Sequence, residues 1–344
     1  MSDSKFDHPW PDVDVVMPIR NEADYLATAV AAVRSQDYPG RVRIFLGIGP
    51  SEDGTEQVAD ALAVGRQDLV VVPNPSGLTP SALNVAIRAG AAPIVVRVDG
   101  HSELSEAYIR RAVETMQRTG AVNVGGRQVP LPTTPFEEAV AAATTSWLGT
   151  GGASYRVGGN EGPVDTVFLG VFDRAAIEAV GLFDERLIRN QDYELNIRLR
   201  QAGGTVWFDP QLSVAYRPRG SWSALAKQYY EYGYWKAQVI RMHPRSAKLR
   251  QLAPPGAVGV LLAASGAAVR WRRLGAIPLG YSTVLVASFL ARSPRRALLA
   301  SSLVATIHVA WALGTFVGAA RVIRRGRAVS NPLSASPEPN LQAW

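Results

Sequence analysis

The chain has 344 residues, 47% hydrophobic and 19% charged, and a formal net charge of +7. It contains no cysteine, which excludes disulfide bonds, thiolate catalysis and cysteine-bound metal. Residues 1–250 carry 26 Lys/Arg against 28 Asp/Glu, whereas residues 251–344 carry ten Arg and one acid. The net positive charge therefore belongs to an apolar tail. This location argues against nucleic acid as a partner and favours anionic lipid.

Residues 1–11 are polar and acidic and contain no apolar leader, so we expect a short tail and a domain that stays in the cytoplasm. From residue 13 to 98, short apolar runs alternate with helical stretches. The runs are Val13–Met17, Val42–Ile48, Val70–Val72 and Ile94–Val98, and the helices are Ala23–Val33, Thr55–Val64 and Pro80–Ala89. This alternation predicts an α/β fold with a mostly parallel sheet, in which ligands bind beyond the carboxyl ends of the strands.

The second half of the domain has a mixed pattern. Strands are predicted at Ala121–Gly125, Thr166–Phe172 and Thr205–Phe208, and helices at Phe136–Trp147, Asp192–Gln201 and Ser221–Ile240. The Gly-rich stretch Gly149–Gly162 is a candidate lid over an acceptor, or a plain surface loop. The last helix is aromatic and basic, which suits a membrane interface or packing onto the domain.

Three apolar segments follow, Leu252–Val269, Leu274–Ala291 and Ala297–Ala320. The third is long enough to span a bilayer, whereas the first two are near the lower limit and fit a span, a re-entrant hairpin or an interfacial helix. A buried helical hairpin of a soluble protein is the alternative. Arginines flank every end, so charge does not settle the orientation. We expect a membrane region at 252–320 with two or three helices, and a basic, then disordered tail at 321–344.

Polar residues follow the first two predicted strands. Pro18–Glu22 (PIRNE) opens a helix whose N-terminus offers free N–H groups to an anion. Asn21 as a simple helix cap explains the same residues. Gly49–Thr55 (GPSEDGT) reads as a tight turn into a second helix, and turn chemistry alone accounts for it.

Two further groups carry candidate chemistry. Asp99 and His101 lie two residues apart after the fourth run, and a carboxylate with an imidazole suits Mn²⁺ or Mg²⁺ bridging a diphosphate. A helix-capping Asp beside a surface His is the alternative. Asp192 opens a later helix, where it is either a cap or a general base that takes a proton from an acceptor hydroxyl.

In this order, the motifs resemble those of family 2 glycosyltransferases with the GT-A fold, and most closely the succinoglycan-type glucosyltransferases, over about residues 13–244. The matching motifs are P-x-x-N-E at Pro18–Glu22, S-x-D-G-T at Ser51–Thr55, GLTPSALNVAI at Gly77–Ile87, D-x-H at Asp99–His101, VGLFDE at Val180–Glu185 and QDYELNIRLRQAG at Gln191–Gly203.

The resemblance implies a catalytic domain at 12–245 and an inverting enzyme of the cell membrane. Such an enzyme moves one hexose from a nucleotide-sugar to a polyprenyl-linked glycan, in polysaccharide or glycolipid synthesis. It further implies that Asp99 and His101 hold the metal, and that Asp192 is the base. By the same resemblance, the residues that bind the donor nucleotide are Pro18, Arg20, Glu22, Asp53, Asn84 and Asp99.

The chain departs from the family pattern at several positions. Ile48 and Gly49 stand where relatives carry a pair of carboxylates, one of which reads uracil, so uridine recognition does not carry over. Ser76, Gln191 and Tyr216 replace a usual Lys, Glu and His. The Q-x-x-R-W motif of processive synthases is absent, which favours addition of a single sugar.

Three other functions compete with this interpretation. The departures allow a catalytically silent membrane scaffold, and a processive polysaccharide synthase is the nearest enzymatic alternative. A sugar nucleotidyltransferase would need a Gly-rich phosphate loop where the chain has PIRNE.

Overall fold

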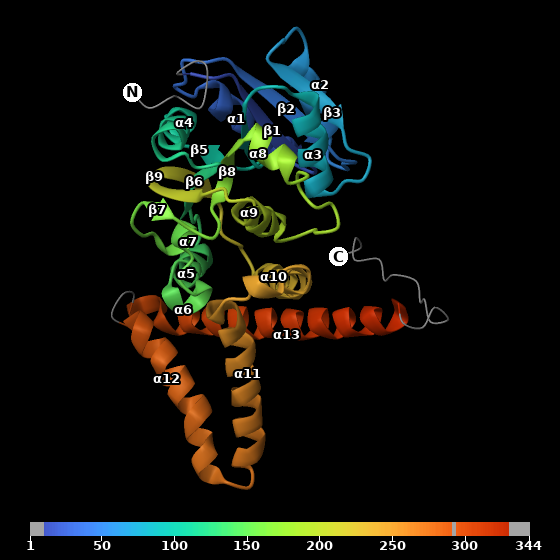
Figure 1. Ribbon diagram of the computed structural model, residues 1–344. Helices are drawn as coiled ribbons and strands as arrows, with labels where there is room; N and C mark the ends of the chain where they lie inside the picture. Colours follow the sequence, from blue (N-terminus) through green and yellow to red (C-terminus); the bar gives the residue numbers. More distant parts are fainter. Residues whose placement is uncertain (1–9, 291–293, 330–344) are drawn as a thin grey trace. The chain divides into compact units, whose positions relative to one another are not determined.

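The computed structural model describes residues 10–290 and 294–329, which form two compact units. The first unit contains the residues up to Trp222 together with Val284–Val304, and the second contains Ser223–Thr283 together with the chain from Ala305 onward. The first unit is built on one mixed sheet, and the second consists of helices (Figure 1).

Strands in the sheet follow the order β3-β2-β1-β4-β8-β6-β9-β5, and β7 pairs with β9. Their bounds are β1 Val13–Ile19, β2 Val42–Ile48, β3 Leu69–Pro73, β4 Ile94–Arg97, β5 Glu103–Leu104, β6 Asn123–Pro130, β7 Gly162–Pro163, β8 Phe168–Asp173 and β9 Val206–Tyr216. The first four are mutually parallel, and β8 is antiparallel to both β4 and β6. The predicted parallel sheet is therefore confirmed in its first half, whereas in the second half β8 runs antiparallel to both of its neighbours and β9 is again parallel to β6.

Apolar side chains of β1 alternate between two cores, one on each face of the sheet. Val13, Val15 and Met17 pack with helices α1 (Ala23–Arg34), α2 (Thr55–Ala63) and α4 (Tyr108–Thr119). On the opposite face, Val16 and Phe45 pack with α3 (Thr79–Ala89), α8 (Arg174–Ala179) and α9 (Gln191–Gln201). Because both faces are covered, the sheet presents only its edges and strand ends to ligands (Figure 1).

A buried ion pair interrupts this apolar core. Asp14 of β1 is fully buried and accepts hydrogen bonds from Arg174 Nη2 at 2.8 Å, Arg43 Nη2 at 3.0 Å and the Ala92 backbone N–H at 2.7 Å. The Arg174 guanidinium also donates to the carbonyls of Ile87 and Ala92. This network joins β1 to α8 through groups that are costly to leave unpaired.

Several elements differ from the sequence-based expectation. α4 was not predicted, and β9 continues to Tyr216 beyond the predicted end at Phe208. The predicted helix Phe136–Trp147 divides into α5 (Pro135–Thr144) and α6 (Trp147–Thr150), because the Ser146 hydroxyl caps α6 through the Gly149 N–H. The Gly-rich stretch is not one open loop, since α6 and α7 (Ser154–Val157) fold within it.

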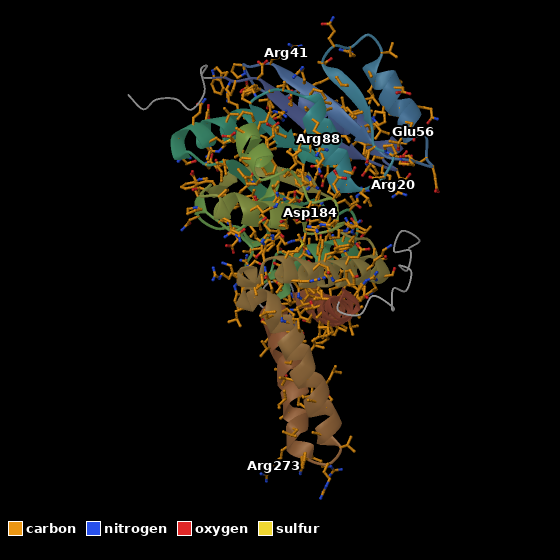
Figure 2. All side chains as sticks on the ribbon, turned by 45° about the vertical axis from the view of Figure 1, so that its right-hand side comes forward. Arg20, Arg41, Glu56, Arg88, Asp184 and Arg273 are labelled. Atoms are coloured by element: carbon orange, nitrogen blue, oxygen red, sulfur yellow. The ribbon has the colours of Figure 1, made fainter. Side chains whose placement is uncertain are left out.

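Helices in the C-terminal part are α10 (Trp222–Met242), α11 (Leu249–Ala268), α12 (Ala276–Leu290) and α13 (Ala297–Val329). Among the described residues, three segments are long and apolar enough to cross a membrane: Leu249–Ala268, Arg272–Leu290 and Ala297–Ile323. Within the second unit, α11 and the first part of α12 form a hairpin whose tip carries Arg273 (Figure 2).

In the second unit, α10 and α13 approach each other through glycines. A Cβ added to Gly314 would lie 2.0 Å from the Tyr230 carbonyl oxygen, and one added to Gly233 would lie 2.2 Å from the Trp311 carbonyl oxygen. Gln238 Nε2 donates to the Gly318 carbonyl at 3.2 Å. Half of the most apolar stretch of α13 is buried, against 22% for α11 and 11% for the segment that contains α12. A larger share of α13 than of the other two segments is therefore covered by protein.

Candidate active site at the carboxyl ends of the parallel strands

The predicted functional segments meet at one edge of the sheet. β1 and β2 run in parallel with Ile19 opposite Ile48, and β4 pairs with β1 with Arg97 opposite Val16. PIRNE begins with the last two residues of β1, GPSEDGT directly follows β2, and DGH lies one residue beyond the end of β4. Because parallel strands end at the same edge, their following loops gather around one site.

The first two segments are joined by hydrogen bonds between backbone N–H groups at the start of α1 and side chains of the β2–α2 turn. The bonds are Asn21 N to Ser51 Oγ at 3.1 Å, Glu22 N to Thr55 Oγ1 at 2.8 Å and Ala23 N to Asp53 Oδ2 at 3.1 Å. The prediction that these N–H groups are free for an anion is therefore wrong, because neighbouring side chains already bind them. Asn21 does not cap α1 with its side chain, which instead accepts from the Glu52 N–H.

Asp53 has a structural role in these hydrogen bonds, which form a clasp between the β1–α1 and β2–α2 loops. Its second oxygen, Oδ1, accepts from the Thr55 hydroxyl at 2.5 Å and from the Thr55 N–H at 3.1 Å. The hydrogen bonds from the Thr55 hydroxyl and the Ala23 N–H hold the pKa of Asp53 below its usual value. Asp53 thus shapes the loops, and direct contact with the nucleotide stays a prediction.

Pro18 and Arg20 border the same turn. Pro18 lies in β1 opposite Gly47 of β2. Arg20 is exposed and donates from Nε to the Pro50 carbonyl at 3.2 Å, and Figure 2 shows it at this end of the sheet. A Cβ added to Gly77, whose φ is +65°, would lie 3.5 Å from Arg20 Nη1. The exposed guanidinium of Arg20 is therefore accessible to a phosphate or a base.

His101 contacts Glu22 of the first segment. Its Nδ1 lies 2.7 Å from Glu22 Oε1, while the His101 side chain is about half exposed. This hydrogen bond raises the pKa of His101, and burial opposes the rise. With Nδ1 held by a carboxylate, Nε2 is the nitrogen left to face a ligand. Two predicted site residues from different segments therefore lie together.

Arg97 joins the third and fourth segments. It is the last residue of β4 and is buried, with 7% of its side chain exposed. Its Nε and Nη2 lie 3.0 Å and 2.9 Å from Asp99 Oδ1, and its Nη1 is paired with Asp192 Oδ1. Burial lowers the pKa of Arg97, but the charges of Asp192 and Asp99 outweigh it and raise the pKa above its usual value. The predicted base and the predicted donor-side carboxylate thus share one guanidinium.

Asp192 lies in the first turn of α9, and 36% of its side chain is exposed. Burial raises its pKa, the Arg97 charge lowers it and the Asp99 charge raises it, so that the pKa lies above its usual value. A raised pKa makes a carboxylate a stronger base. Asp192 is therefore partly accessible, and its role as a general base stays a prediction.

Asn84 lies apart from this cluster. It is 2% exposed, and its Nδ2 donates to the Phe183 carbonyl at 2.9 Å and to Glu185 Oε1 at 2.8 Å, while its Oδ1 accepts from the Phe183 N–H at 3.0 Å. The amide thus anchors the segment before α9. Its place near the nucleotide stays a prediction.

Asp99 and His101 have the donor chemistry of a divalent metal site. Both bonds from Arg97 use Asp99 Oδ1, so Oδ2 has no hydrogen bond partner among the described residues, and the same holds for His101 Nε2. Within the described ranges, no three His, Asp or Glu side chains form a cluster that could hold a metal. The residues therefore fit a cation that takes two protein ligands and completes its shell with phosphate or water oxygens.

Arg97 was missed by sequence reasoning, although a signal was present. It is the one charged side chain in the strand IVVR, and it directly precedes the D-x-H motif. A cation in a buried strand needs partners of opposite charge. A buried cation next to candidate catalytic carboxylates is therefore itself a candidate site residue.

Comparison with known proteins finds similarity to one family over the first part of the chain. Residues 14–181 match the model of the family described as glycosyl transferase family 2. The chain is 29% identical over 310 residues to the succinoglycan biosynthesis protein ExoA of Rhizobium meliloti (strain 1021), covering 87% of this chain and 92% of the relative.

Two further similarities support the same grouping. A dolichyl N-acetyl-alpha-D-glucosaminyl phosphate 3-beta-D-2,3-diacetamido-2,3-dideoxy-beta-D-glucuronosyltransferase of Methanococcus voltae is 25% identical, over 67% of this chain and 74% of its own. Among solved structures, the mannosyltransferase PcManGT from Pyrobaculum calidifontis in complex with GDP-Man and Mn²⁺ matches with a TM-score of 0.61 and 18% identity, covering 89% of this chain and 87% of that one. This likeness confirms the GT-A fold.

Proposed function

Because the chain carries a family 2 glycosyltransferase domain and is a glycosyltransferase of polysaccharide or glycolipid synthesis, we propose that it transfers a single hexose from a nucleotide-sugar to a lipid-linked glycan with inversion. One observation carries this proposal. Asp99, on the donor side, and Asp192, the candidate base, are bound to the same Arg97 guanidinium. Two carboxylates held this close, one for the donor and one for the acceptor, match a single displacement.

The donor side consists of Asp99, His101 and the loop clasp. A divalent cation bound by Asp99 and His101, as Mn²⁺ accompanies GDP-Man in the related structure, would neutralise charge on the departing diphosphate. Glu22 orients the His101 ring through Nδ1. Arg20 stands exposed at the mouth, where it contacts the nucleotide or its phosphates.

Asp192 serves the acceptor side as general base. Its raised pKa suits it to take the proton of an acceptor hydroxyl while that oxygen attacks the anomeric carbon. The oxygen–carbon bond forms as the bond to the diphosphate breaks on the opposite face. The anomeric configuration is therefore inverted in one step.

A lipid-linked acceptor agrees with the apolar helices. Three described segments are long and apolar enough to cross a membrane, which brings the enzyme to the bilayer where such an acceptor lies. We place the catalytic domain on the cytoplasmic side, where nucleotide-sugars are made. Protease protection of the catalytic domain in sealed, right-side-out vesicles tests this orientation.

The experiment that tests the reaction uses membranes containing the full chain and a panel of nucleotide-hexoses. Asp192→Asn and Asp99→Ala are each expected to lose about 100-fold or more in transfer rate, which is the usual contribution of a general base or a charge-stabilising group. Asp68→Asn, at the surface pair with Arg34, is the matched control and should keep full activity.

Mass spectrometry of the product decides between single addition and a processive synthase, since we expect an increment of one hexose. Full transfer by either carboxylate variant would overturn the assigned roles. Absence of divalent-dependent donor binding in the unmodified chain would instead support a silent scaffold.

A further inference from the structure

We propose that Arg97 is a positioning residue that sets the orientation of both reactive carboxylates through one buried guanidinium. The inference rests on the proposed function, since it assigns Arg97 to the alignment of Asp99 with Asp192. Nothing in the family motifs quoted above includes Arg97.

Arg97 binds one oxygen of each carboxylate. Its Nε and Nη2 hold Asp99 Oδ1, and its Nη1 holds Asp192 Oδ1. Neither Oδ2 atom has a hydrogen bond partner among the residues described. The guanidinium thus takes one oxygen of each carboxylate and leaves the other for the donor side and the acceptor hydroxyl respectively.

The position of the Arg97 guanidinium is fixed by the sheet and by burial. Arg97 ends β4, where its backbone pairs with Val16 of β1, and its side chain is nearly fully buried. Asp192 is 95 residues away in the chain, on α9. The guanidinium of Arg97, which is held by the sheet, therefore sets the orientation of the Asp192 carboxylate on α9.

Arg97 also places a positive charge between the carboxylates of Asp99 and Asp192. Two carboxylates in one crevice repel each other when no cation lies between them. The planar fork of Arg satisfies both from fixed directions, whereas a Lys ammonium is a point charge on a flexible stem. Lysine at position 97 would keep the charge but lose the geometry, and misplacement of a reacting group by about 1 Å is enough to cost on the order of 100-fold in rate.

The test compares Arg97→Lys with Arg174→Lys in the purified full chain. Arg174 is also a buried arginine that pairs with an aspartate of the same sheet, but it contacts Asp14 and backbone carbonyls rather than the site. For Arg97→Lys we expect kcat to fall about 30- to 100-fold, with the donor KM changed by less than about threefold. For Arg174→Lys we expect a lower Tm and an unchanged kcat of the folded enzyme.

A double variant tests whether Arg97 acts through Asp192. If it does, adding Arg97→Lys to Asp192→Asn should slow the enzyme by a smaller factor than Arg97→Lys causes in the unmodified chain, because the part of its contribution that acts through Asp192 is already gone while the part through Asp99 remains. Multiplied losses in the double variant would overturn the inference. So would a kcat for Arg97→Lys within about threefold of the unmodified enzyme.

A second variant keeps the inference testable if lysine is not accommodated. Arg97→Ala removes the side chain, and added guanidinium ion at low millimolar concentration should restore part of kcat, whereas sodium at equal ionic strength should not. Restoration by both salts, or by neither, would contradict positioning by a guanidinium. Thermal shift with Mn²⁺ and a nucleoside diphosphate gives a readout apart from turnover, and we expect binding by Arg97→Lys to persist.

The outcomes separate the two proposals. Loss of activity in Asp192→Asn and Asp99→Ala with a normal Arg97→Lys refutes the positioning role alone. Full activity in the aspartate variants refutes the proposed function, whatever Arg97 does.

Discussion

Replacing Asn84 by Ala distinguishes a structural anchor from a nucleotide ligand. Asn84 is 2% exposed and makes three hydrogen bonds, two to the backbone of Phe183 and one to Glu185. Alanine leaves the Phe183 N–H and carbonyl without these partners. Each buried group left unsatisfied costs about 1–3 kcal/mol.

The expected loss in the free energy of unfolding is therefore about 2–6 kcal/mol, from the two backbone groups together. For a domain of this size, about 1 kcal/mol shifts the Tm by roughly 2–4 °C, so we expect a decrease of about 4–24 °C. Differential scanning fluorimetry of the full chain in detergent measures this shift. Ser76→Ala, at an exposed residue before the same helix, is the control and should stay within about 2 °C.

The second readout is donor affinity below the transition temperature. An anchor predicts that the folded Asn84→Ala variant binds the nucleotide-sugar within about threefold of the unmodified chain, since no site atom is lost. A Tm within 2 °C of the unmodified chain combined with a tenfold weaker donor affinity would refute this reasoning and return Asn84 to the nucleotide pocket.

Three further changes test other parts of the structure. Asp14→Ala leaves Arg174 buried without its carboxylate and should lower the free energy of unfolding by about 3–5 kcal/mol in urea titrations; a loss below about 1 kcal/mol would show that the pair is not tightly coupled to the fold. Gly314→Val places side-chain carbon where Cβ meets the Tyr230 carbonyl at 2.0 Å, so it should destabilise the α10–α13 contact by about 1–3 kcal/mol and speed proteolysis there, and unchanged proteolysis would contradict this contact. The lowered pKa of Asp53 stabilises the fold at neutral pH, and this contribution is lost as pH falls from about 4 through the folded-state pKa; Asp53→Asn should flatten the Tm profile in that window, and an unaltered slope would argue against the clasp.

The strands of the first half could be predicted closely because buried parallel strands read as continuous apolar runs. Val42–Ile48 and the start of α1 at Ala23 match the structure residue for residue. Helix α4 was missed although Ile109, Ala112, Val113 and Met116 follow the helical spacing and are buried. The charged residues between them obscured a pattern that was present.

The site was harder to predict, because its contacts join distant segments. Sequence spacing placed Asp99 and Asp192 on different elements, but it gave no means to see that Arg97 binds both across 95 residues. The N–H groups before α1 looked free because their partners belong to a turn about 30 residues later. Tertiary pairing of this kind depends on the register of the sheet, which local patterns do not contain.

The clasp between the β1–α1 and β2–α2 loops has a consequence for selectivity. Since side chains of one loop already saturate the backbone of the other, both loops are ordered before any substrate arrives, and little conformational entropy remains to be lost on encounter. Under the proposed function, the choice among nucleobases then falls to exposed side chains beside these loops, such as Arg20. Substituting them should change which base is accepted without remodelling the loops beneath.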